Sequence, residues 1–77
     1  ITKIMYNLPN KEFVKINIYN MLGREVKILV NKVQEAGLNT IKWDGLDDYN
    51  MKLPSGLYLY SIKAGSFKET KKMLFLK

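Results

Sequence analysis

The side chains best suited to chemistry lie in one short acidic segment, which contains Asp44, Asp47, Asp48 and Asn50. Carboxylate and amide oxygens are the ligands that calcium takes from proteins, so this segment could hold a calcium ion. Its spacing does not follow the D-x-[DN]-x-[DN]-G pattern with a Glu at the twelfth position, and Asp-Gly and Asp-Asp pairs are ordinary turn formers. We therefore expect a structural loop without a metal or other cofactor, in which Asp44 bonds backbone amides of the loop.

Aromatic side chains could form a second kind of site, a platform on which sugars or single-stranded nucleic acid would stack. Their positions within strand-like segments favour a buried core instead. The aromatic residues expected in the core are Tyr6, Trp43, Tyr58 and Tyr60. Tyr58 also follows a Pro-Ser-Gly corner, where a β-sandwich can place a tyrosine whose hydroxyl bonds nearby backbone. A carbohydrate-binding module is one alternative function, and it requires Tyr19, Tyr49 or Trp43 to be exposed together.

Positive charge is concentrated toward the end of the chain, where residues 63–77 hold five of the thirteen basic residues and one of the seven acidic ones. Lys68, Lys71, Lys72 and Lys77 could contact the phosphates of nucleic acid or of anionic lipid. Nucleic-acid binders usually spread many Arg and Lys residues over a broad face, whereas Arg24 is the only Arg of this chain. Lysines on an edge strand also keep other strands from pairing with it, so we expect no nucleic-acid partner.

The residue inventory argues against an enzyme. The 77-residue chain contains neither His nor Cys, and so lacks the usual general base, the commonest metal ligand and the reactive thiol. Its apolar runs are far shorter than the roughly 20 residues that span a bilayer as a helix, so we expect no stable membrane insertion. A chain of this size has room for one core. We expect a single domain over residues 1–77, and the missing initial Met suggests a fragment of a longer protein.

Alternation of apolar and polar residues predicts β-strands through most of the chain. In the third strand we expect Val26, Ile28 and Val30 on the apolar face, although residues 24–35 could also be taken for a short helix. The strands are expected at residues 2–8, 14–19, 26–30, 40–43, 57–64 and 67–77, with a long loop at residues 44–56 that contains a short extended piece at residues 51–53. The pattern predicts an all-β fold, a small immunoglobulin-like antiparallel β-sandwich of about seven strands.

Five segments in this order resemble a known family. They are Ile4-x-Tyr6-x-Leu8-Pro9, Ile18-Tyr19-Asn20-Met21-Leu22-Gly23-Arg24-Glu25-Val26, Trp43-Asp44-Gly45, Pro54-Ser55-Gly56-Leu57-Tyr58 and Lys71-Lys72-Met73-Leu74-Phe75-Leu76-Lys77. Together they resemble the type A C-terminal sorting domain of type IX secretion cargo in bacteria of the Bacteroidetes type. The related FlgD-like immunoglobulin-like domains of flagellar hook-cap proteins share most of these positions, and Leu59-Tyr60-Ser61 is nearer to that branch.

The resemblance implies a sorting signal that directs a preceding cargo protein through the periplasm and across the outer membrane to the cell surface or the medium. The implied partners are the type IX translocon, a sortase-like peptidase that commonly removes the domain, and the covalently preceding cargo. The residues implied in translocon recognition are Pro54, Gly56, Tyr58, Lys71, Lys72, Met73, Leu74, Phe75, Leu76 and Lys77. The alternative is a structural FlgD-like immunoglobulin-like spacer or assembly module of an extracellular protein.

Overall fold

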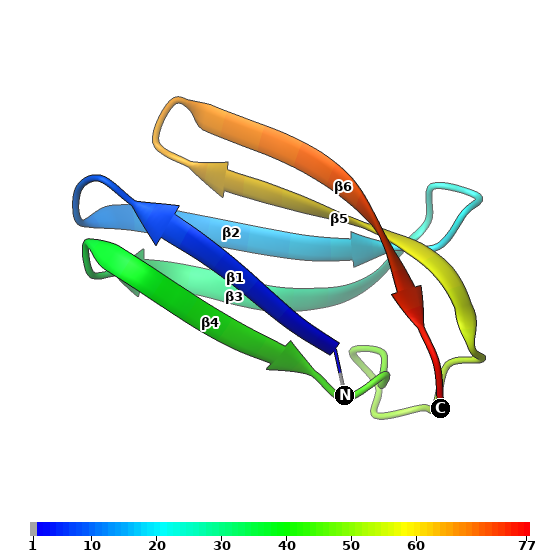
Figure 1. The fold of residues 1–77 in the computed structure, drawn as a ribbon. Coiled ribbons are helices and arrows are strands. Elements are labelled where there is room, and N and C mark those ends of the chain that lie inside the picture. Colours follow the sequence, from blue (N-terminus) through cyan, green and yellow to red (C-terminus); the bar gives the residue numbers. More distant parts are fainter. Residues whose placement is uncertain (1) are drawn as a thin grey trace.

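Residues 2–77 of the chain are described by a computed structural model, so the first residue of the expected domain lies outside the described part. These residues form six antiparallel strands in two facing sheets (Figure 1). The strands are β1 (Thr2–Leu8), β2 (Glu12–Tyr19), β3 (Glu25–Gln34), β4 (Gly37–Trp43), β5 (Gly56–Ala64) and β6 (Phe67–Phe75). One sheet pairs β1 with β4, and the other has the order β3-β2-β5-β6. The predicted all-β immunoglobulin-like sandwich is confirmed.

The described residues contain six strands where about seven were expected. The expected extended piece at residues 51–53 makes only an isolated bridge between Leu46 and Lys52. Turns on either side hold the loop in a compact form, because the Asp47 backbone N–H donates to the Met51 carbonyl and Asn50 takes a positive φ of 62°. Among residues 2–77 there is no helix whose length and apolarity would let it cross a bilayer.

The alternating apolar residues predicted from the sequence fill the space between the sheets. One buried cluster lies toward the end that carries the β1–β2, β3–β4 and β5–β6 turns, and it contains Ile4, Tyr6, Leu8, Val14, Ile16, Val30, Ile62 and Ala64. A second cluster consists of Ile18, Trp43, Tyr58 and Phe75. Partly buried Leu29, Tyr60 and Met73 contact both clusters and join them into one core.

Strand β3 departs from the predicted alternation. It is a strand and not a helix, but Ile28 is 38% exposed on the outer face while Leu29 packs against the core. The cause is a β-bulge, since Ile16 pairs with Val30 and the next residue, Asn17, pairs with Ile28, which leaves Leu29 as the extra residue. Such an insertion reverses the faces of the residues that follow it. The prediction that Ile28 lies on the apolar face was therefore wrong.

Candidate functional site

The two segments whose residues the resemblance implies in translocon recognition lie side by side in the structure. Residues 54–58 lead into β5, and the end of β6 pairs with the start of β5 through the pairs Gly56 with Phe75 and Leu57 with Leu74. Beyond β6, the Lys77 backbone N–H donates to Ser55 Oγ at 2.9 Å. The terminal segment is thus attached to the Pro-Ser-Gly corner by both strand pairing and a side-chain bond.

The inward face of this region is aromatic core. The Phe75 ring is only 5% exposed, and its centroid lies 4.9 Å from that of Trp43 and 6.3 Å from that of Tyr58. Trp43 and Tyr58 themselves meet edge to face at 5.2 Å, a favourable geometry for aromatic pairs. Gly45 makes room for this packing, because a β-carbon there would overlap the Phe75 ring. Tyr58 and Phe75 therefore serve the packing of the folded domain.

The corner tyrosine is formed as predicted. The Tyr58 hydroxyl donates to the Pro54 carbonyl at 2.6 Å and so ties the start of β5 to the loop before it. The ring is buried, and this burial raises the pKa of Tyr58 above its ordinary value of 10.0. The hydroxyl consequently stays protonated and keeps its donor role at neutral pH.

The outward face of the same region carries exposed apolar side chains flanked by lysines. Leu57 and Leu74 are cross-strand partners and are both about half exposed, and Leu76 follows them at 65% exposure. We call this group the C-terminal edge surface; its residues are Leu57, Lys72, Leu74, Leu76 and Lys77. Lys72 and Leu74 lie on β6, Leu57 lies on β5, and Leu76 and Lys77 follow the end of β6, a strand that pairs only with β5 among residues 2–77. The surface offers apolar contact and positive charge beside a free strand edge.

The other residues implied by the resemblance are placed less favourably for contact. Lys71 pairs with Tyr60 and so belongs to the inner side of β6, where its ammonium lies 3.2 Å from the Glu69 carboxylate. Met73 is partly buried and packs against the core. Pro54 is exposed at the corner, and Gly56 is half-buried with a positive φ of 156°, a backbone conformation that residues with a side chain rarely adopt. Of the ten residues, Lys72, Leu74, Leu76 and Lys77 are exposed on the outer side of β6 or beyond its end, so these four are best able to meet a partner.

A shallow cavity of about 330 Å³ adjoins the C-terminal edge surface. Leu76 and Lys77 line it on one side, together with Phe75, and the acidic loop lines it on the other through residues 44–46 and Lys52. The cavity shows that the last residues lie against the long loop. Its walls combine the Asp44 carboxylate, the ammonium groups of Lys52 and Lys77, and apolar side chains.

The acidic loop uses its carboxylates for local structure. Asp44 Oδ1 accepts from the Leu46 backbone N–H at 3.1 Å, which confirms the expected bond from Asp44 to the loop backbone. Asp47 Oδ1 accepts from the backbone N–H groups of Tyr49 and Met51, at 2.8 and 2.9 Å. Asp48 accepts from the Ile28 N–H across the loop. Within residues 2–77 these carboxylates do not gather into a group that could hold a metal ion.

The aromatic platform required for carbohydrate binding is not present on the surface. Trp43 is fully buried, and its indole Nε1–H donates to the Leu46 carbonyl at 3.0 Å. Tyr49 is 85% exposed in the loop and Tyr19 is half-buried at the end of β2. Because Trp43 cannot stack on a ligand, the three residues named by the carbohydrate hypothesis do not act together.

Sequence reasoning missed three residues of this region. Leu57 joins the exposed surface only through its register with Leu74, Ser55 anchors Lys77, and Gly45 accommodates the Phe75 ring. The Asp-Gly pair was a visible turn signal for Gly45. The partners of Leu57 and Ser55 depend on strand pairing, which the local sequence does not show.

The fold is an immunoglobulin-like β-sandwich, and the candidate site lies at the β5–β6 edge of its larger sheet. Residues 2–67 match the model of the FlgD Ig-like domain family, so the chain belongs to that family. The chain is also similar to FlgD from P. aeruginosa in its crystal structure, with 27% sequence identity and a TM-score of 0.74. The similarity covers 94% of this chain and 55% of that one, so the chain spans about half the length of that protein. Comparison with curated proteins gave no match.

These comparisons bear on the two implied families differently. The FlgD-like immunoglobulin-like resemblance is confirmed, whereas neither comparison supports the type IX sorting domain in particular. The family match also ends at Phe67, the first residue of β6. Most of the terminal strand therefore lies outside the matched range.

Proposed function

We propose that the domain is a non-catalytic immunoglobulin-like module that supplies a folded unit to a larger extracellular or flagellar protein and takes part in its assembly. The observation that carries this proposal is the position of Phe75. The end of β6 is part of the sandwich core, because Phe75 is buried between Trp43 and Tyr58. The terminal strand therefore contributes to a stable sandwich as well as to its surface.

A structural role also agrees with the chemistry of the side chains. The chain has no His or Cys, and the loop carboxylates of Asp44, Asp47 and Asp48 accept hydrogen bonds from backbone amides. The apolar and basic C-terminal edge surface offers contact area for a protein partner. Membership of the FlgD Ig-like family supports the same assignment.

A reporter fusion tests the proposal. The domain is joined behind a periplasm-directed fluorescent protein in a bacterium with a working type IX system and in a translocon-deficient strain. A structural module leaves the reporter in the periplasm in both strains, with the domain folded as judged by protease resistance. Export that depends on the translocon would contradict this assignment.

The second candidate is a type IX sorting signal, favoured by the outward side chains of the terminal segment. Lys72, Leu74, Leu76 and Lys77 are exposed beside a strand that has a free edge within residues 2–77. A translocon component could pair with this edge, with backbone bonds giving affinity and side-chain pockets giving selectivity. On this hypothesis the cargo passes through the periplasm to the cell surface or the medium, where a sortase-like peptidase acts.

Point substitutions test the sorting hypothesis better than a deletion, because removing residues 72–77 also removes Phe75 from the core. The double variant Lys72→Ala/Lys77→Ala changes exposed side chains only. The matched control is Lys3→Ala/Lys42→Ala, an exposed cross-strand pair on the other sheet. A sorting signal read at the C-terminal edge surface loses export in the first variant and keeps it in the second, and equal export of both would contradict it.

A further inference from the structure

A row of three lysines crosses the outer face of the larger sheet. Lys15 of β2 pairs with Lys63 of β5, and Lys63 also pairs with Lys68 of β6. Lys15 follows the buried Val14 and points away from the core, and its two partners lie on the same face. Because neighbouring strands lie about 4.8 Å apart, the bases of the three side chains lie within about 10 Å of one another. We call Lys15, Lys63 and Lys68 the lysine row.

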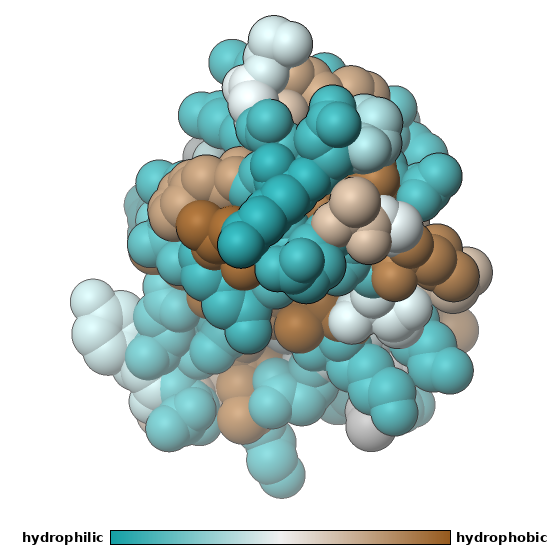
Figure 2. All heavy atoms as spheres, turned by 90° about the vertical axis from the view of Figure 1, so that its left-hand side faces the viewer, coloured by the Kyte–Doolittle hydropathy of each residue, from teal (hydrophilic) through white to brown (hydrophobic). Residues whose placement is uncertain are grey.

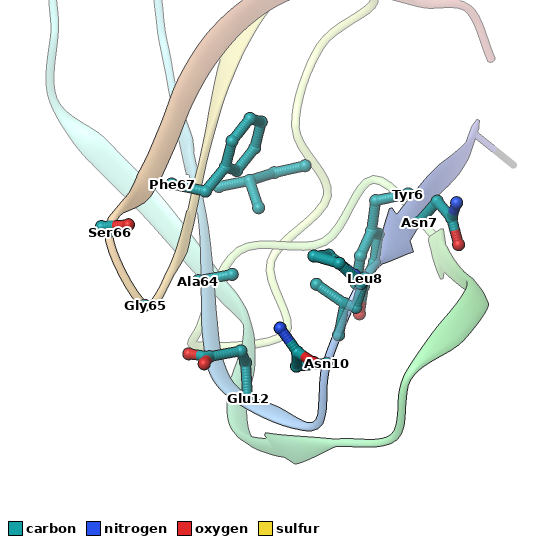
Figure 3. Close-up of a pocket in the computed structure, with 11 residues that line it drawn as sticks. Tyr6, Asn7, Leu8, Asn10, Glu12, Ala64, Gly65, Ser66 and Phe67 are labelled. Carbon is teal, nitrogen blue, oxygen red and sulfur yellow. The ribbon is translucent and has the colours of Figure 1, made fainter.

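Among residues 2–77, no acidic side chain forms an ion pair with the lysine row. The ion pairs in this part of the chain involve other lysines, and they are Lys11–Glu35, Lys27–Asp48 and Lys71–Glu69. Glu12 precedes the row on β2, but it lies against Gly65 and lines a cavity of about 340 Å³ at the end of the sheet, as Figure 3 shows. Like charges directly opposite one another destabilise a sheet, so the row lowers the stability of the folded chain.

Protection of a sheet edge does not explain the position of the lysine row. Lysines on an edge strand keep other strands from pairing with it, and β6 is an edge strand, so this role accounts for Lys68. Strands β2 and β5 are the two inner strands of the order β3-β2-β5-β6. Lys15 and Lys63 therefore guard no edge, although they place positive charge in the middle of the face.

Exposed apolar side chains lie on the same face. Phe13 and Val33 are cross-strand partners beside the row and are 54% and 52% exposed. The half-exposed pair of Leu57 and Leu74 lies at the other end of the face, next to Lys72. The positive charges thus lie between two apolar pairs. We call this surface the basic sheet face; its residues are Phe13, Lys15, Val33, Lys63, Lys68 and Lys72.

This combination favours an anionic lipid surface over other anionic partners. A membrane offers phosphates to lysines and an apolar layer to half-exposed side chains. The basic sheet face draws on all four strands, an area that a planar surface meets at once and a single extended segment does not. Nucleic-acid binders use many Arg residues, whereas Arg24, the only Arg, lies between β2 and β3. Figure 2 shows that the end of the molecule with the β1–β2, β3–β4 and β5–β6 turns is mainly hydrophilic, which favours contact through the face.

We propose that the basic sheet face binds the surface of a membrane that contains anionic lipid. The ammonium groups of the lysine row contact lipid phosphates, and Phe13 and Val33 contact the boundary between headgroups and acyl chains. The domain lies on the membrane without spanning it. The lysine row does not belong to the C-terminal edge surface, so this inference goes beyond both functions proposed above and holds for either.

Vesicle binding tests the proposal directly. The 77-residue chain is mixed with vesicles of phosphatidylcholine alone or of equal parts phosphatidylcholine and phosphatidylglycerol, and the bound fraction is measured by sedimentation. The proposal predicts binding to the mixed vesicles and little to phosphatidylcholine alone. Raising the salt concentration from about 0.1 M to about 1 M should release most of the bound chain, because it shortens the screening length from about 10 Å to about 3 Å.

Substitutions in the lysine row locate the contact. Lys15→Gln/Lys63→Gln/Lys68→Gln should weaken binding to the mixed vesicles by about a hundredfold, since each lysine near an anionic membrane contributes about fivefold. The variant removes opposed like charges and should remain folded, which circular dichroism checks. Lys15→Arg/Lys63→Arg/Lys68→Arg keeps the charge and should keep the binding.

The matched control removes three exposed lysines outside the basic sheet face, as Lys3→Gln/Lys42→Gln/Lys52→Gln. Its binding should fall far less, because charges more than about 8 Å from the membrane are largely screened at physiological salt. The proposal is overturned if both kinds of vesicle bind equally, or if the control loses as much affinity as the variant of the lysine row. Tighter binding to soluble polyglutamate than to mixed vesicles of equal charge would also overturn it and would assign the face to an acidic polypeptide.

Discussion

The opposite faces of β6 give the sharpest test of how the terminal segment is used. Phe75 and Leu74 are neighbours in the chain, but Phe75 is 5% exposed in the aromatic cluster and Leu74 is 56% exposed on the outer face. Truncation of a buried Phe to Ala costs about 3–5 kcal/mol, through lost apolar burial and the cavity that remains. An exposed Leu changes stability by about 0.5 kcal/mol or less. Phe75→Ala should therefore be strongly destabilising and Leu74→Ala nearly neutral.

The size of the chain makes this difference easy to measure. A domain of 77 residues has a free energy of unfolding of about 4–12 kcal/mol, so Phe75→Ala removes a large part of it. The corresponding fall in melting temperature is at least about 12 °C, at about 4 °C or more per kcal/mol for a domain of this length. Leu74→Ala should shift it by about 4 °C at most.

Urea titration followed by circular dichroism and by fluorescence measures both variants. Trp43 is the only Trp of the chain and is fully buried, so its emission reports the opening of this end of the core. Circular dichroism controls for any direct effect of Phe75 on that emission. Losses that agree within about 1 kcal/mol for the two variants would refute the assignment of opposite faces and of the terminal strand to the core.

The remaining predictions concern the same end of the core. Gly45→Ala and Gly37→Ala both place a side chain at positive φ, but only Gly45 faces the Phe75 ring. In urea titration Gly45→Ala should therefore lose about 1–3 kcal/mol more free energy of unfolding than Gly37→Ala. Equal losses would contradict the overlap with the Phe75 ring. Tyr58→Phe should cost about 0.5–1.5 kcal/mol by the same method, because it removes the corner hydrogen bond, and an unchanged midpoint would show that the bond contributes nothing. Burial raises the pKa of Tyr6 and Tyr58 above 10.0, so as the pH rises the unfolded chain releases these protons before the folded chain does. The free energy of unfolding is therefore unaffected below about pH 10 and falls above it. Replacing both tyrosines with Phe should reduce this fall, measured as the change in the urea midpoint with pH.

Much of the fold follows from local sequence patterns. The first strand was predicted at the residues it occupies, and the alternation of Val14, Ile16 and Ile18 identified the buried face of β2. The Pro-Ser-Gly corner predicted the hydrogen bond of Tyr58 to nearby backbone, which the structure contains. These features depend on side-chain alternation and turn chemistry, both of which act over a few residues.

The features that escaped prediction depend on which strands meet. The bulge that exposes Ile28 arises from the pairing of β2 with β3, and Leu57 becomes part of a surface only through its partner Leu74. Alternation states which face a residue takes but not which residue lies opposite. The contact of Glu12 with Gly65 joins residues more than fifty positions apart, so no local sequence pattern predicts it. The candidate sites are therefore less predictable than the strands that carry them.

Strand β6, one of the edge strands of the larger sheet, is poorly suited to receive an added strand. Strand β6 carries lysines along its length and an inward Glu69–Lys71 ion pair, which are devices that discourage another strand from adding to an edge. Because these side chains hinder strand pairing at β6, a partner of the C-terminal edge surface is expected to contact the outward side chains of Leu74 and Leu76 more than the backbone of β6.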